Sequence, residues 1–581
     1  MLAQNRRSGP MEPALKNNWR EMGVPCLLGA ALNILGFGFQ YGIGNHIFEL
    51  AMLNWLRQPT LYPRDQIREA YLRFPTLFWR IIAHVPAQIS TVAVLFIIFL
   101  ATKLIFFYGL VKLARCASPD RYFSRGVAII FALSPLLNIR SPFGYSPILD
   151  SIQTQTPLAI ALMVCAGAWL VEGKWVRSAI LTAACVYVNA IYVVYMLFPF
   201  VVLALTDIRR NRRQVLASAA AGAAIIVPWL VWNRALVGTQ YPPEYVPALL
   251  LYFPRHLVLS SHNRIDFLYG PAFLCIALAA VILGYKRGTL INRRLELMAV
   301  SFAVPVSLGA AAGQFHLTPV IASLQLMRAD GFLFLYASVL LAAALYPLTK
   351  TGALLYARVI LVIAALVFVL PLTPMRILLL LVGLGAAFRG PCADALRGVD
   401  ILSRQRLGPS QHLAKLSRAA TPIMILVILA ASAGAASVDR RTWDAFVFSA
   451  QKGDWLAVQT WARMNVPRDS IFLVPPSASG FRIDSLRSSW GEWKDGTAIY
   501  LDHAFAPVYI NRMYSLGVYK PPLNPGGPES MPEIFKRQSF DYLRKVALEN
   551  HLQYIVQYHS VKYAAKPLYS NSSYDIYSVA P

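Results

Sequence analysis

The chain has 581 residues, of which 57% are hydrophobic and 14% charged, and its mean hydropathy is +0.49. This composition excludes a soluble globular protein, because repeated apolar runs of roughly 20 residues need lipid around them. The formal net charge of +26 does not indicate nucleic-acid binding, since Lys and Arg collect in the cytoplasmic loops of multi-pass membrane proteins. The sequence therefore predicts a helical membrane protein.

Thirteen apolar segments are expected to cross the membrane, with an uncertainty of one or two because several are short. They lie at residues 23–44, 87–113, 125–138, 156–172, 177–189, 191–206, 214–235, 268–285, 296–313, 330–347, 353–370, 373–389 and 420–437. The first has no small-residue cleavage signature after it, so we expect a retained span and not a removed signal peptide.

Basic runs follow the sixth, eighth and twelfth segments, at residues 209–213, 286–294 and 389–418. Because positive loops stay in the cytoplasm, these runs predict a cytoplasmic N-terminus and an extracytoplasmic C-terminus. Residues 1–437 are then a transmembrane domain, and residues 438–581 a soluble domain outside the cytoplasm. The long loops fall on that same outer face, where we expect the functional site.

The first of these loops, residues 45–84, carries Glu49, Asp65 and Glu69 in a chain with few acidic residues. Its apolar spacing predicts two short helices on the membrane surface, the second running from residue 66 to residue 80. Asp65 lies at the break between the helices, where an Asp either caps a helix N-terminus or faces a reaction. Glu49 is expected to lie on a helix that packs against the membrane.

A second isolated carboxylate, Asp150, comes just before the fourth segment. It has the same two interpretations, a helix cap or a functional group at a membrane surface. The predicted spans are nearly free of charged residues, which argues against a transport pathway through them.

Basic and imidazole side chains gather in a later outer loop, where Arg255, His256 and His262 lie close together in sequence. Two His six residues apart lack the spacing of a helical metal pair, and the six Cys form no CxxC motif, so no zinc site or disulfide framework is predicted. These side chains suit a phosphate, or else belong to an ordinary interfacial helix. Arg328, at the mouth of a span, either holds a lipid phosphate or snorkels to headgroups.

After residue 437 the composition changes to aromatic, Pro and mixed-charge residues, enough for a small α+β domain. DWLAVQTWARMNV predicts an amphipathic helix, and SIFLVPP, HLQYIVQYH and SYDIYSVA predict strands. The aromatic residues either form the core or line a glycan groove, and we favour the core.

This layout resembles the GT-C superfamily of polytopic membrane glycosyltransferases. The residues that carry the resemblance are Asp65 and Glu49 in the first loop, Asp150 in the second, and Arg328 before a late span. The chain departs from the family pattern because its first loop has no DD, DE or ED dipeptide. WARMNVPRDSIFLVPPSASGFRIDSLRS is also similar to a C-terminal module of bacterial membrane proteins, which favours a bacterial inner membrane.

The resemblance implies transfer of a sugar from a polyprenyl-phosphate donor to a lipid, glycan or protein acceptor in the cell envelope. Such chemistry needs a carboxylate to accept the proton of the acceptor and cations to stabilise the leaving phosphate. We expect Asp65 to be the base, with Asp150 and Glu49 as further catalytic candidates. Arg328, His256, His262 and Arg255 are the candidate phosphate ligands.

Two other functions stay open at this point. One is a non-catalytic partner in envelope glycan assembly that kept the fold and lost the base, and the other is a lipid or glycan transporter. The sequence indicates no cofactor, although a divalent metal ion is compatible with the candidate carboxylates.

Overall fold

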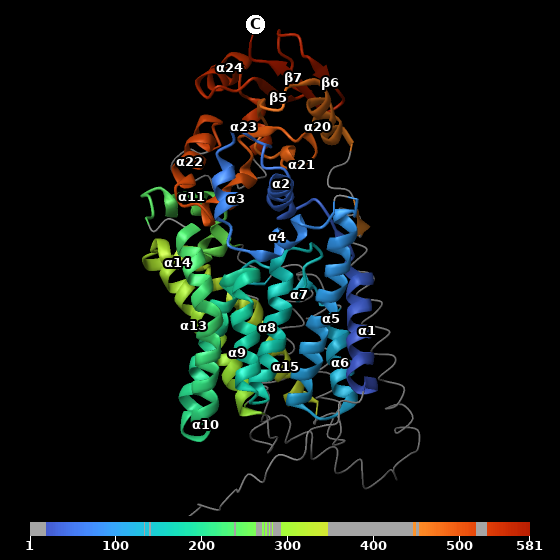
Figure 1. Cartoon of the computed structure of the whole chain (residues 1–581), viewed down its shortest axis with the longest axis vertical. Coiled ribbons are helices and arrows are strands. Elements are labelled where there is room, and N and C mark those ends of the chain that lie inside the picture. The colour runs from blue at the N-terminus through green and yellow to red at the C-terminus, as the bar shows by residue number, and fades with distance from the viewer. Residues whose placement is uncertain are drawn as a thin grey trace, which may run out of the picture.

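A computed structural model describes residues 19–346 and 446–580, apart from residues 87, 133, 139–140, 237–239, 449–452 and 519–530 and parts of 263–291. Figure 1 shows a bundle of long helices with a mixed region of helices and strands on one end. The last three predicted spans and the domain boundary at residue 437 lie outside the described residues.

The bundle contains helices of very different lengths. They are α1 (Trp19–Phe37), α5 (Thr91–Ala117), α6 (Arg121–Ala132), α7 (Pro135–Asn138), α8 (Gln155–Val171), α9 (Trp175–Ala184), α10 (Val186–Leu236), α13 (Arg293–Phe315) and α15 (Asp330–Leu345). Within the described residues, four stretches are long and apolar enough to cross a membrane: Thr91–Ala117, Val186–Arg234, Arg293–Phe315 and Pro319–Ala344. The expectation of a mostly helical chain with several apolar spans is confirmed, whereas the count of thirteen spans stays a prediction.

Helix α10 covers 51 residues, and its backbone leaves the helical region at Asn211. The Tyr187 hydroxyl donates to the Ile225 carbonyl at 3.3 Å, although a straight helix would separate these residues by about 57 Å. The chain therefore turns back within α10, and the basic run 209–213 surrounds its break at Asn211. This matches the two separate spans that the sequence predicts on either side of that run.

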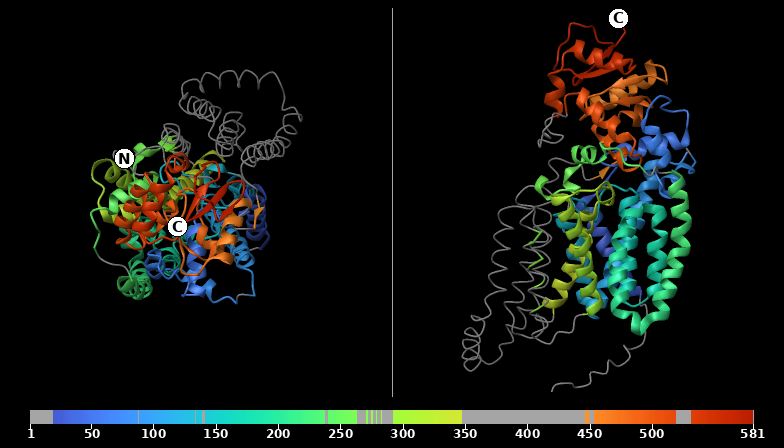
Figure 2. Two further views of the ribbon diagram at one scale, coloured as in Figure 1. Left: turned by 90° about the horizontal axis from the view of Figure 1, so that it is seen from above. Right: turned by 90° about the vertical axis from the view of Figure 1, so that its left-hand side faces the viewer.

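Ion pairs lie at the same end of the bundle as this turn. Arg294 Nη2 lies 2.7 Å from Asp207 Oδ2, and Lys112 Nζ lies 2.5 Å from Glu172 Oε1. The long loops and the C-terminal region gather at the opposite end (Figure 2). The predicted separation of basic turns from long loops is present, while the side that faces the cytoplasm stays a prediction.

The first long loop forms β1 (Phe39–Gln40) and three helices, α2 (His46–Arg57), α3 (Ile67–Arg73) and α4 (Leu77–Ala83). The single helix expected from residue 66 to residue 80 is wrong, because Pro75 separates α3 from α4. Thr76 then caps α4 by accepting a hydrogen bond from the Phe78 amide at 3.2 Å. Strand β1 pairs in parallel with β2 (Phe446–Val447), a contact that the sequence did not predict.

The long loop after α10 and the chain between α13 and α15 add shorter elements on the same end. These are α11 (Tyr245–Tyr252), η1 (Pro254–His256), η2 (Leu259–Ser261), α14 (Pro319–Leu324) and η3 (Leu326–Ala329).

The C-terminal region has a five-stranded sheet with strand order β4-β3-β5-β7-β6. Its elements are α20 (Gly453–Asn465), β3 (Ile471–Leu473), α21 (Phe481–Ser485), β4 (Ser488–Trp490), η5 (Trp493–Tyr500), α22 (Phe505–Ser515), α23 (Met531–Lys536), α24 (Phe540–Glu549), β5 (Tyr554–Tyr558), β6 (Tyr569–Ser570) and β7 (Tyr574–Ser578). The predicted helix and the three predicted strands are confirmed. Trp455 and Trp490 are buried in apolar clusters, so these aromatic residues pack in the core as favoured.

One apolar core joins the first long loop to the C-terminal region. Trp79 of α4, Tyr245 of α11 and Ile499 of η5 are each 0% exposed and belong to one cluster. Removing apolar surface from water is the dominant favourable term in folding, so this shared core fixes the loop against the C-terminal region.

Candidate functional site

Asp65 is buried against the C-terminal region. Its Oδ2 lies 2.6 Å from Arg482 Nε on α21, and its Oδ1 accepts a hydrogen bond from the Ile67 amide at 3.2 Å. Asp65 is 6% exposed and Arg482 is 3% exposed. Both carboxylate oxygens therefore have partners within the protein, and one of these bonds holds the start of α3.

Arg482 also binds three further residues of its own region. Its Nη1 lies 2.7 Å from Asp495 Oδ1 and 3.5 Å from Glu492 Oε1, while its Nη2 donates to the Ser489 carbonyl at 2.7 Å. Burial raises the pKa of Glu492 to about 7, although the guanidinium favours the charged form. We call Asp65, Arg482, Glu492 and Asp495 the Arg482 cluster; every nitrogen of its guanidinium is used.

Glu49 lies in a second buried acidic group, in contrast to its expected place against the membrane. It is 3% exposed, and the Gln155 side chain at the start of α8 donates a hydrogen bond to it. Its Oε2 has no hydrogen-bond partner among the described residues. Burial raises the pKa of Glu49 to about 8, and the negative charge of Asp150 adds to the shift.

Asp150 does not cap α8, because the Thr154 side chain does so by accepting from the Thr156 amide. Asp150 Oδ1 accepts from the Ile152 amide at 3.0 Å, and desolvation by the surrounding protein raises the pKa of its carboxyl. Lys103 Nζ donates to the Asp150 backbone carbonyl at 2.8 Å.

Lys103 and Arg328 are the cations beside Asp150. Both favour its charged form, and Lys103 is 2% exposed within α5, one of the helices long and apolar enough to cross a membrane. Arg328 Nη1 donates to the Gln325 amide oxygen at 2.8 Å, and its Nη2 donates to the Tyr192 hydroxyl at 3.0 Å. The Arg328 Nε is buried and has no partner among the described residues.

His256 supports the loop that carries Asp150. The His256 Nδ1 donates to the Gly144 carbonyl at 2.6 Å, since only the ring nitrogen can be the donor. Burial holds the pKa of His256 well below its ordinary value, and the nearby Arg328 charge lowers it further. A neutral ring with its proton on Nδ1 has only an acceptor left at Nε2, which does not favour the predicted contact with phosphate.

Asp330 holds the other side of the same loop. Its Oδ2 accepts from the Phe143 amide at 2.7 Å and from the Gly144 amide at 2.8 Å. A Cβ at Gly144 would lie 2.5 Å from the Arg328 Cα, so the close approach of the two chains requires glycine here. These contacts fix the loop that contains Asp150 against the segment that contains Arg328 and Asp330.

Arg255 is exposed on this loop, and His262 is half-buried beside it. The Arg255 Nη1 donates to the Tyr145 hydroxyl, and its guanidinium lies 4.6 Å from the centroid of that ring. The His262 ring makes an edge contact with Tyr145 at 6.1 Å between centroids. Their predicted role in binding phosphate is not tested by these contacts.

Four predicted residues interact in series, Glu49 with Asp150, Asp150 with Arg328, and Arg328 with His256, whereas Asp65 lies in a separate cluster. We call Glu49, Asp150, Lys103 and Arg328 the Glu49 cluster. The sequence analysis did not select Lys103, although an ionisable residue inside an apolar span is itself an indication of function.

It also missed Lys494 of η5, whose Nζ donates to the Asn45 side chain at 3.0 Å and whose charge favours the ionised form of Glu49. No local pattern marks Lys494. In the part of the chain that the structure describes, no three His, Cys, Asp or Glu residues lie together as metal ligands.

Comparison with known families gives one match in the C-terminal region. Residues 453–511 match a family described as a domain of unknown function, DUF6798. No curated protein matches the chain. The matched segment covers about a tenth of the sequence and contains Arg482 and Lys494, which contact Asp65 and Asn45 of the first long loop.

Proposed function

We propose that this protein is a membrane glycosyltransferase that moves a sugar from a polyprenyl-phosphate donor to an acceptor hydroxyl in the cell envelope, outside the cytoplasm. One observation carries the proposal: a carboxylate and a guanidinium with unused buried atoms, Glu49 Oε2 and Arg328 Nε, flank Asp150 at the loop end of the bundle. Buried polar atoms rarely stay without partners in folded proteins, so two of them beside one carboxylate indicate a place where water or a ligand supplies the missing bonds.

In the proposed reaction, the acceptor oxygen forms a bond to the anomeric carbon while the bond from that carbon to the donor phosphate breaks. The acceptor proton passes to Glu49, whose pKa of about 8 lies near neutral pH, where a general base is most effective. The leaving phosphate takes the bonding electrons and is stabilised by the Arg328 guanidinium. Asp150 raises the basicity of Glu49 and is itself held by Lys103.

This assignment moves the base from Asp65 to Glu49, because both Asp65 oxygens already have partners in the protein. It keeps Arg328 as the phosphate ligand and gives His256 a supporting role. Arg255 lies on the exposed side and remains a candidate for an outer contact with the donor.

A buried lysine inside a span favours a second candidate, a transporter of lipid-linked glycans. Ionisable side chains such as Lys103 are expensive within a membrane and often mark a pathway. The two candidates differ in one product, since a transferase releases polyprenyl phosphate and a transporter returns the donor intact.

The test compares wild-type protein with Glu49→Gln, Asp150→Asn and Arg328→Lys in liposomes that contain polyprenyl-phosphate sugars. Loss of the base should lower the release of polyprenyl phosphate by about a hundredfold or more. The Arg328→Lys variant should weaken donor binding by about tenfold, because Lys cannot reproduce the guanidinium fork.

Glu69→Gln is the matched control, since Glu69 is an exposed carboxylate of the same loop. Equal release by wild-type protein and both carboxylate variants would overturn the proposal. Movement of intact donor across the bilayer without any release would favour the transporter instead.

A further inference from the structure

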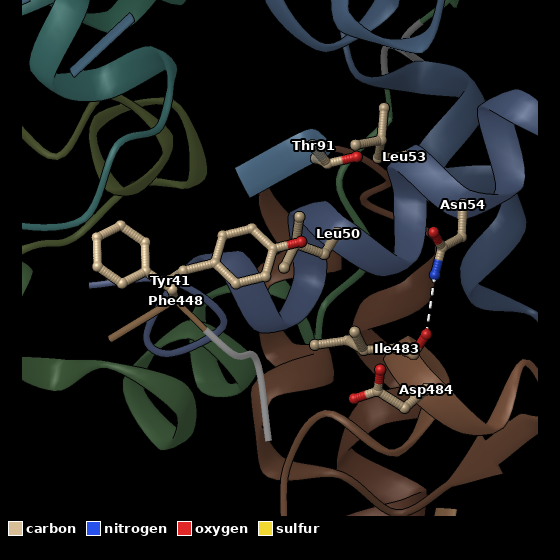
Figure 3. Close-up of a pocket in the computed structure, with 8 residues that line it drawn as sticks. All are labelled: Tyr41, Leu50, Leu53, Asn54, Thr91, Phe448, Ile483 and Asp484. Carbon is tan, nitrogen blue, oxygen red and sulfur yellow. Dashed lines mark hydrogen bonds between the residues drawn. The ribbon is translucent and has the colours of Figure 1, made fainter. Parts of the chain in front are cut away.

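A separate pocket lies between α2 and the C-terminal region, next to the first residue of α5. It has a volume of about 280 Å³, just below the roughly 300–1,000 Å³ of drug-sized ligand sites and enough for a small ligand. The lining residues are Tyr41, Leu50, Leu53, Asn54, Thr91, Phe448, Ile483 and Asp484. Figure 3 shows the Tyr41 ring on one side of the pocket and the Asp484 carboxylate on another.

Two polar side chains of this pocket are held by hydrogen bonds to neighbouring residues and can each form a further hydrogen bond. The Asn54 amide nitrogen donates to the Ile483 carbonyl at 3.0 Å. The Thr91 hydroxyl accepts from Arg57 Nη1 at 2.8 Å, so its own hydrogen remains available to a ligand. These contacts fix the side chains in place before a ligand arrives.

Asp484 is the unusual member of the lining. It is half-buried, and its Oδ2 is buried with no hydrogen-bond partner in the described part of the chain. Desolvation raises the pKa of its carboxyl, and the charge of Arg463 acts in the other direction. A carboxylate whose buried oxygen lacks a partner is a strong acceptor for a ligand that carries hydroxyl groups.

We propose that this pocket binds one sugar unit of a glycan acceptor, an inference that rests on the proposed function. The Tyr41 and Phe448 rings border the pocket, and its accessible lining is mainly polar, which suits a ligand rich in hydroxyl groups. The Asp484 carboxylate and the Thr91 hydroxyl supply the acceptor and donor that sugar hydroxyls need. A purely apolar ligand would leave the Asp484 oxygen unsatisfied.

The position of α2 sets the size of the acceptor. Leu50 faces the pocket and Glu49 faces Gln155, and consecutive residues of a helix point about 100° apart. The pocket and the Glu49 cluster thus lie on different sides of a helix that is about 10–12 Å wide with its side chains. A single sugar cannot occupy both places, so the acceptor is an oligosaccharide or a longer glycan.

The test measures binding without any donor, so that it does not depend on transfer. Full-length protein in nanodiscs is screened by saturation-transfer NMR against free neutral, acidic and amino-sugar oligosaccharides, and against the same neutral glycans linked to a polyprenyl lipid. We expect binding of neutral oligosaccharides, weakened about tenfold in Asp484→Asn and lost in Asp484→Leu and Tyr41→Leu. Binding of the free glycan identifies a soluble acceptor, and binding of the linked glycan alone identifies a lipid-linked one.

Two further variants separate the possible failures. Asp541→Asn, an exposed carboxylate of the same region, should bind as wild type, and Asp150→Asn should bind as wild type while losing transfer. If no oligosaccharide binds, or if Asp484→Leu binds normally, the pocket assignment is wrong even where transfer is observed. A requirement for a free ammonium group on the ligand would also overturn it, whereas binding without transfer under any donor would count against the proposed function alone.

Discussion

The Arg482 cluster and the Glu49 cluster contain the same kinds of side chain and are used in opposite ways. In the Arg482 cluster, one guanidinium binds carboxylates from two distant parts of the chain, and each of its nitrogens has an acceptor. In the Glu49 cluster, Glu49 Oε2 and Arg328 Nε have no partner in the described part of the chain. The first arrangement holds two regions together, and the second leaves bonding capacity unused.

The comparison teaches that buried charge alone does not locate a functional site. Breaking a buried ion pair is strongly destabilising, because it leaves an uncompensated charge in the interior. A fully paired cluster is therefore a structural feature by default. Unused bonding capacity beside a perturbed carboxyl, as at Glu49, is the better indicator of chemistry.

The largest effect should come from removing the centre of the paired cluster. Arg482→Ala leaves Asp65, Glu492 and Asp495 buried without their cation, and we expect the free energy of unfolding to fall by about 5 kcal/mol. Thermal unfolding in detergent measures this change. Arg468→Ala, which removes an exposed arginine of the same region, is the control and should unfold as wild type. A melting temperature of Arg482→Ala equal to that of the control would show that the cluster does not join the two regions.

The Glu49 cluster should make the free energy of unfolding depend on pH. The folded-state pKa of Glu49, about 8, lies above its ordinary value of 4.5, so the folded protein keeps a proton that the unfolded chain releases. The stability from this group is complete below pH 4.5 and is lost as pH rises to about 8. Between pH 4.5 and 7 we expect a loss of about 3 kcal/mol, at roughly 1.4 kcal/mol per pH unit.

Glu49→Gln cannot titrate and should lack this component of the pH dependence. Unfolding of the two proteins, measured from pH 4.5 to 9, gives the difference directly. The same ionisation should make transfer rise with pH and level off above about 8. Parallel stability curves for wild type and Glu49→Gln would mean that Glu49 is not held in its protonated form.

Local patterns were sufficient to predict much of the fold. Apolar run length gave α5 and α13, the basic run at 209–213 gave the turn in α10, and alternating apolar residues gave the strands β5 and β7. Asp150 and Arg328 could be chosen because ionisable residues at the ends of spans are conspicuous in sequence.

The pairing of the acidic residues could not be predicted in the same way. Asp65 and Arg482 are 417 positions apart, and no periodic pattern connects them. Glu49 and Asp65 look alike in sequence, since both are carboxylates of the first long loop. Only the three-dimensional arrangement places an arginine beside Asp65, and a side-chain amide and a second carboxylate beside Glu49. Lys103 was overlooked because one lysine does not interrupt an apolar run, although its cost in a membrane should have marked it.

Asp65→Asn should have the smallest effect on stability of these variants. It also distinguishes most clearly between a structural role for Asp65 and a catalytic one. If Asp65 were the base, as its place in the sequence predicts, Asn would cap the helix equally well, so that stability would be kept and transfer lost. The contacts with Arg482 reverse this expectation. Asn keeps the shape of the side chain but loses a charge-assisted hydrogen bond, which is worth about 1.5–3 kcal/mol. We therefore expect a lower melting temperature and unchanged transfer per folded molecule. Glu69→Gln should change neither quantity, and loss of transfer at an unchanged melting temperature would return the base to Asp65.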